Sequence, residues 1–88
     1  MNRIEMIREK LTVSLSPENL EIIDRSHEHV GHEGAKAGGG HFDVIIVTEA
    51  FNGMNTVQRH RAIYAALGDA MKSEIHALSI RAYTPEEF

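Results

Sequence analysis

Four of the six histidines of this chain lie in one glycine-rich stretch, Ser26–Phe42, at His27, His29, His32 and His41. Neutral imidazole is the commonest metal ligand in proteins, so these side chains could hold a metal ion or a metal group shared with a partner. The metalloprotease motif would need a histidine four residues after His27, and Gly31 stands there. Spacing alone leaves two interpretations open: a metal or partner site, or solvated polar side chains of a loop.

The glycines of this stretch predict a long surface loop, because ordering glycine in a helix or a buried strand has a large backbone entropy cost. Loops of this length are typically functional or disordered. A phosphate-binding loop is not predicted, because Lys36 is followed by Ala37 instead of Ser or Thr and no helix begins there to hold an anion.

Two further groups of residues lie outside the loop. His76 opens the last predicted strand, where a capping or packing role is the alternative to a ligand role. Arg59 and Arg61, on either side of His60, form a basic patch with Lys72. Such a patch could contact phosphates or could be a charged, solvated surface.

The sequence predicts no enzyme. No serine stands in a recognisable nucleophile motif with a base partner. The paired carboxylates Glu86 and Glu87 lie in the terminal tail and are expected to be solvated.

Composition describes one small globular domain over residues 1–88, with 42% hydrophobic and 25% charged residues. The chain has no cysteine, which excludes disulfides and any iron–sulfur site built from its own thiolates. Its net charge of −4 argues against a large sequence-independent nucleic-acid footprint. Without a long apolar run or the apolar core of a signal peptide, we expect a cytosolic protein that makes no membrane contact.

Apolar periodicity and turn residues predict six elements. The expected helices are Asn2–Leu15, a helix from the N-cap Asn55 to Leu67, and a short Asp69–Lys72. The expected strands are Leu20–Arg25, His41–Thr48 and His76–Thr84.

Local signals add detail to the helix that follows Asn55. Gln58 is expected to complete a capping box with Asn55, and Gly68 to cap the other end. Its apolar side is expected to consist of Val57, Ile63, Ala66 and Leu67, with Tyr64 beside them.

The order of these elements is α-β-β-α-α-β. The first two strands can pair antiparallel across the loop, whereas a strand–helix–helix–strand connection favours parallel pairing of the last two. We therefore expect an α+β fold in which helices cover one face of a three-stranded mixed sheet.

Four longer segments closely resemble the BolA family. They are S-H-E-H-V-G-H-E-G-A-K-A-G-G-G-H-F, V-T-E-A-F-N-G-M, V-Q-R-H-R-A-I-Y-A-A-L-G-D-A-M and I-H-A-L-S-I-R-A-Y-T-P. With the first helix, the resemblance covers the chain nearly end to end. It implies an α-β-β-α-α-β fold related to the type II KH domain. The RNA-clamping G-x-x-G loop of KH domains is missing, because Met71 stands where its second glycine would be.

The resemblance implies partnership with a monothiol glutaredoxin, with which BolA-like proteins bridge a [2Fe–2S] cluster in iron–sulfur cluster maturation, trafficking or iron regulation. It implies His76 as one ligand and a loop histidine as the other, first His29, then His32, His41 or His27. The glutaredoxin would add a cysteine and a glutathione thiolate. Two imidazoles opposite two thiolates form a Rieske-like set, which raises the reduction potential. The isolated protein is expected to be a cofactor-free monomer or weak homodimer.

Two other functions compete with this one. Other BolA-like proteins are transcription regulators in stress response and cell morphology, and the resemblance then implies DNA contacts by Arg59, Arg61 and Lys72 on a helix–turn–helix face. The loop residues on their own also allow a metal buffer that binds zinc or nickel through His27, His29 and His32. A ligand role for His76 requires that its side chain be substantially exposed.

Overall fold

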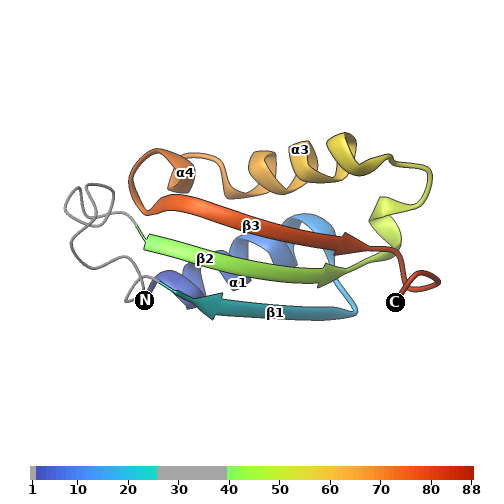
Figure 1. Cartoon of the computed structure of the whole chain (residues 1–88), viewed down its shortest axis with the longest axis horizontal. Helices are drawn as coiled ribbons and strands as arrows, with labels where there is room; N and C mark the ends of the chain where they lie inside the picture. Colours follow the sequence, from blue (N-terminus) through green and yellow to red (C-terminus); the bar gives the residue numbers. More distant parts are fainter. Residues whose placement is uncertain (1, 26–39) are drawn as a thin grey trace.

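The computed structural model describes residues 2–25 and 40–88, and its elements follow the predicted order (Figure 1). They are α1 (Arg3–Leu15), β1 (Asn19–Asp24), β2 (Gly40–Val47), the short 3-10 helix η2 (Glu49–Phe51), α3 (Thr56–Leu67), α4 (Ala70–Ser73) and β3 (Ile75–Tyr83). The strands form one sheet in the order β1-β2-β3. β1 is antiparallel and β3 parallel to β2. The predicted α+β fold with a mixed sheet is confirmed.

The hydrophobic core lies between the helices and one face of the sheet. β2 shows this most clearly, because its alternate residues Phe42, Val44 and Ile46 are fully buried while His41, Asp43 and Ile45 on the other face are only half-buried. The helices contribute Ile7 and Leu11 from α1 and Ile63 and Leu67 from α3 to the same core. No helix of residues 2–25 and 40–88 covers the opposite face of the sheet (Figure 1).

Both predicted caps of α3 are present, and α1 has an N-cap at Asn2, a residue expected inside the helix. Asn2 caps α1 by accepting a hydrogen bond from the backbone N–H of Glu5 at 2.8 Å. Asn55 and Gln58 form the capping box of α3, with both hydrogen bonds at 2.9 Å. Gly68 ends α3 with a φ of 53°, a left-handed value that glycine adopts readily.

Three sequence predictions need correction. All three strands begin and end one residue earlier than expected, and α4 begins and ends one residue later. Gly40 was assigned to the loop, but it is buried and starts β2, where its N–H donates to the Glu74 carbonyl at 3.1 Å. The remainder of the predicted loop, residues 26–39, lies outside the described residues.

The third correction concerns the apolar side of α3. Val57 and Tyr64 are 56% and 41% exposed, whereas Ile63 and Leu67 are fully buried. Successive helix residues are rotated by about 100°, so Val57 and Tyr64 lie well to one side of the direction that Ile63 and Leu67 share. They form an exposed apolar flank.

Candidate metal-ligand and docking site

His76 is the second residue of β3, and its side chain is exposed as a ligand role requires. Its position in the ladder is unusual. Ile75 pairs with Gly40 and Ala77 pairs with His41, so His76 is an extra residue between two consecutive pairs. Such a β-bulge interrupts the ladder and re-aims a side chain. The side chain of His76 therefore does not follow the regular alternation of side chains between the two faces of the sheet.

The backbone around this bulge is fixed by its neighbours. Ile75 is 3% exposed and belongs to the hydrophobic core. Glu74, just before it, accepts the Gly40 N–H and forms an ion pair with Arg3 of α1 at 3.1 Å. His76 is thus an exposed side chain on a firmly held backbone, as a metal ligand or a partner contact requires.

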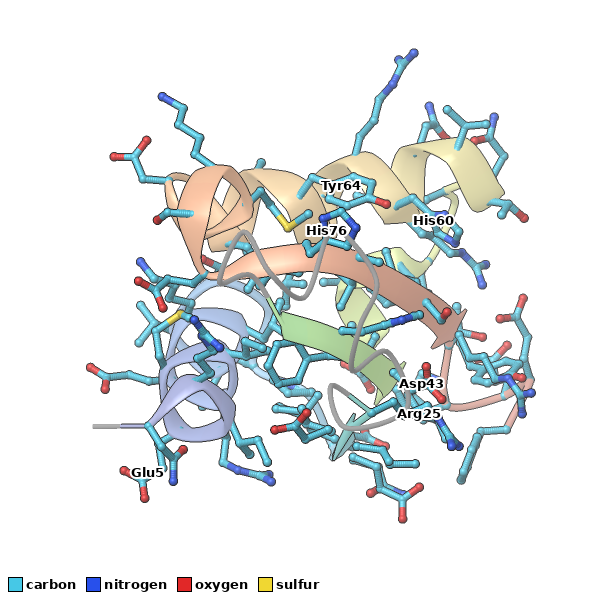
Figure 2. The ribbon with its side chains drawn as sticks, turned by 60° about the vertical axis from the view of Figure 1, so that its left-hand side comes forward. Glu5, Arg25, Asp43, His60, Tyr64 and His76 are labelled. Carbon is cyan, nitrogen blue, oxygen red and sulfur yellow. The ribbon has the colours of Figure 1, made fainter. Side chains whose placement is uncertain are left out.

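The surroundings of His76 come from α3 as well as from β3. Figure 2 shows His76 on the α3 side of β3, in the same part of the molecule as Tyr64 and His60, which are one helical turn apart on α3. Within residues 2–25 and 40–88, the imidazole of His76 makes no hydrogen bond or ion pair. Its ring nitrogens remain available to a ligand or partner.

The other histidine candidates are not brought together with His76 into one site. His41 is half-buried next to the bulge and already has an interaction partner. His27, His29 and His32 lie outside the described residues. In the part of the chain that the structure describes, no three His, Asp or Glu side chains form a metal-binding group. The choice of second ligand therefore stays a prediction.

Arg59, assigned to the basic patch, is engaged inside the fold. Its guanidinium donates to the carbonyls of Met54 and Ala82 at 3.0 and 3.1 Å and to both carboxylate oxygens of Glu87 at 2.5 and 3.0 Å. It also lies 5.9 Å from the centre of the Phe51 ring. A phosphate contact by Arg59 would require it to leave these partners.

The same ion pair corrects the expectation that Glu87 is merely solvated. Hydrogen bonds from Arg59 and, second, from the Thr84 N–H lower the pKa of Glu87 from its usual 4.5 to about 2. Glu87 in turn raises the pKa of Arg59. The C-terminal tail is held to the start of α3 by this pair.

The other two residues of the basic patch are accessible. Arg61 is exposed on α3. The side chain of Lys72 on α4 is 80% exposed and forms only an exposed ion pair with Asp69 at 3.2 Å, which contributes little to stability. Their DNA-contacting role stays a prediction.

The open face of the sheet has a hollow of about 280 Å³ that involves all three strands. Arg25 and Asp43 form an ion pair at its edge, and Ile23, Ser79 and Arg81 also line it. Figure 2 shows Arg25 and Asp43 well apart from His76. The hollow and the exposed histidine are therefore separate features.

Fold and sequence comparisons together define the class. An α+β domain of this topology matches the solved BolA domain of SufE1 from Arabidopsis thaliana with a TM-score of 0.87 and 47% identity, over 100% of this chain and 98% of that one. The family model of BolA-like proteins matches residues 11–87. The chain belongs to the BolA-like family.

Two curated relatives extend this comparison. The chain is 45% identical over 98% of its length to the chloroplastic protein BOLA1 of Arabidopsis thaliana, of which it spans 56%. It is 36% identical over 96% of its length to the DNA-binding transcriptional regulator BolA of Escherichia coli, of which it spans 77%.

Among the described residues, no helix is both long and apolar enough to cross a membrane. A cytosolic location stays a prediction, because BOLA1 is chloroplastic.

Proposed function

We propose that this protein is a non-enzymatic adaptor that binds a monothiol glutaredoxin and shares a bridging [2Fe–2S] cluster with it, in iron–sulfur cluster maturation, trafficking or iron regulation. The observation that carries the proposal is the exposed His76, set on a bulge of β3 with a firmly held backbone. Membership of the BolA-like family supports it.

The donor chemistry of the chain fits a shared cluster. An imidazole nitrogen is a suitable iron ligand in a mixed His and thiolate set, and His76 offers one that no described residue occupies. This chain has no cysteine, so thiolate ligands would have to come from the glutaredoxin and glutathione. When bound, the cluster would supply iron–sulfur and redox chemistry.

We propose that this chain supplies two cluster ligands. One is His76, and the other is a histidine among residues 26–39 or His41. The first ligand is set by the sheet, and we propose His29 as the second, before His32, His41 and His27. Since metal ligands must be deprotonated, cluster binding through two imidazoles should weaken at acid pH.

The test is anaerobic reconstitution of a cluster on this protein mixed with a monothiol glutaredoxin and glutathione, read by visible circular dichroism. The mixture should give a spectrum distinct from that of the glutaredoxin alone. His76→Ala should abolish this spectrum, whereas His60→Ala, a second histidine on the same side of the molecule, should preserve it. An unchanged spectrum with His76→Ala would disprove the ligand assignment. Alanine variants at positions 27, 29, 32 and 41 then identify the second ligand.

A DNA-binding regulator is the second candidate function, favoured by the Escherichia coli relative and by the accessible Arg61 and Lys72. Binding to duplex DNA would then fall steeply with salt concentration. It would weaken with Arg61→Ala and be indifferent to His76→Ala. Arg59→Ala would also loosen the C-terminal tail, so a loss of DNA binding in that variant could have two causes. Arg61→Ala tests the DNA contact without this second effect.

A further inference from the structure

The outer edge of β3 pairs with no other strand among residues 2–25 and 40–88, because β3 pairs with β2 on its inner side. α3 runs alongside this outer edge (Figure 1). The Tyr83 carbonyl accepts from the Thr48 N–H at 3.0 Å, on the β2 side, whereas the Ala82 carbonyl accepts from Arg59 and therefore faces away from β2. Because the backbone groups of successive residues alternate in direction, those of Leu78 and Ile80 face away from β2 as well.

The outward backbone groups of Leu78 and Ile80 are unpaired within residues 2–25 and 40–88. No described residue hydrogen-bonds the outward N–H or carbonyl of Leu78 or Ile80. The bulge at His76 disrupts the ladder on the N-terminal side of Leu78. On the C-terminal side of Ile80, the Ala82 carbonyl accepts a hydrogen bond from Arg59. A strand edge left open in this way can pair with another extended chain.

Charge indicates what kind of chain would fit. The protein has 13 acidic residues and a net charge of −4, yet α3 and β3 contain no Asp or Glu. Arg61 of α3 and Arg81 of β3 are exposed and form no ion pair with any described residue. The two elements along this edge therefore carry basic and no acidic side chains, which favours an acidic ligand.

The exposed flank of α3 adds apolar surface. Val57 and Tyr64 are its exposed hydrophobic residues, and Figure 2 shows Tyr64 and His60 on the same side as His76. Side chains of an added strand would alternate between two faces. On the open face they would lie beside Ser79 and Arg81, and on the other beside Leu78, Ile80 and α3.

We propose that the edge of β3 is a docking site for an extended segment of a partner protein in which acidic and apolar residues alternate, added to the sheet as a further strand. Nucleic acid fits this edge less well, because its affinity rests on many phosphate contacts, and α3 and β3 together have two exposed arginines on a chain of net charge −4. The site uses backbone groups and Arg81, not the histidines, and goes beyond cluster sharing.

The test uses the isotope-labelled 88-residue chain and a blocked synthetic peptide of alternating valine and glutamate with the 9-residue length of β3. A peptide with lysine in place of each glutamate is the control ligand. The glutamate peptide should slow amide hydrogen exchange and shift the NMR signals at Leu78 and Ile80. The amides of Ser79 and Arg81 already face β2, so their exchange should change less.

Reversing the charge of Arg81 tests whether the glutamate peptide binds at this edge or is attracted to the protein non-specifically. Arg81→Glu should lower the affinity for the glutamate peptide by about fivefold, which is the scale of an exposed ion pair. It should also make the lysine peptide the better ligand. Arg8→Glu, at an exposed position of α1, is the matched control and should leave the preference for the glutamate peptide intact.

Four outcomes would overturn the proposal. The first is equal binding of both peptides, and the second is no binding of either at millimolar concentration. The third is a response confined to α1 or to the hollow around Ile23. The fourth is that duplex DNA, and not the glutamate peptide, shifts the β3 amides.

Discussion

Replacing Thr48 with valine tests how the end of β2 is joined to the first helix. Thr48 is 1% exposed. Its hydroxyl donates to the Leu15 carbonyl at 2.7 Å and accepts from the Ala50 N–H at 3.1 Å. Valine keeps the shape of the side chain but removes both bonds. Each buried polar group left without a partner costs about 1–3 kcal/mol. Leu15 is only half-buried and Ala50 is exposed, so we expect a total loss of about 2 kcal/mol in the free energy of unfolding.

Urea unfolding followed by far-UV circular dichroism measures this loss. With a urea m-value of about 1 kcal/mol/M for a small domain, the midpoint should fall by about 2 M. Thr48→Ser retains the hydroxyl and removes one methyl group, so it should cost about 1 kcal/mol. If Thr48→Val is as stable as Thr48→Ser, the two hydrogen bonds do not contribute as argued and the reasoning is refuted.

Three further predictions concern the scaffold. The lowered pKa of Glu87 contributes stability above its usual value of 4.5 that is lost as pH falls towards about 2; thermal melts in this window should show a larger fall for the wild type than for Glu87→Gln. Gly53→Ala should lower the free energy of unfolding in urea by about 1 kcal/mol, because the φ of Gly53 is +81°, although an added Cβ would meet no described atom within 4 Å beyond its two chain neighbours. Ile63→Ala, fully buried, should lose about 2–5 kcal/mol, whereas Val57→Ala on the exposed flank should change stability by less than about 0.5 kcal/mol; equal losses would contradict the flank assignment.

The order and type of the main elements could be predicted because each carries its own local signal. The capping box at Asn55 and Gln58 and the glycine cap at Gly68 depend on residues close in sequence. The start of β2 could not be predicted in this way. Gly40 has a poor strand propensity, yet it is drawn into the sheet by pairing with Ile75, which is distant in sequence. The 3-10 helix η2 likewise begins where Thr48, packed against α1, caps it.

The candidate site was predicted only in part. The resemblance implies a ligand role for His76, which stays a prediction, and the start of β3 lies within one residue of its predicted position. The bulge could not be predicted from the sequence, because polar and apolar residues alternate from Leu78 onward as they do in a regular strand. The bulge arises from the register with Gly40 and His41. The Arg59–Glu87 ion pair joins residues 28 positions apart. The pattern of charges along the sequence therefore could not show whether Arg59 binds another residue of the fold or belongs to an exposed basic patch.

The bulge also explains how the two proposed sites can operate side by side. A strand added to β3 would pair with the regular part of the ladder that follows His76, so the imidazole would stay outside the new pairing. A partner could therefore contact the edge and supply cluster ligands at once, each through different atoms. It follows that His76→Ala should remove the cluster spectrum without changing peptide binding, and Arg81→Glu should change peptide preference without removing the spectrum. Loss of both by either variant would mean that the two sites are one.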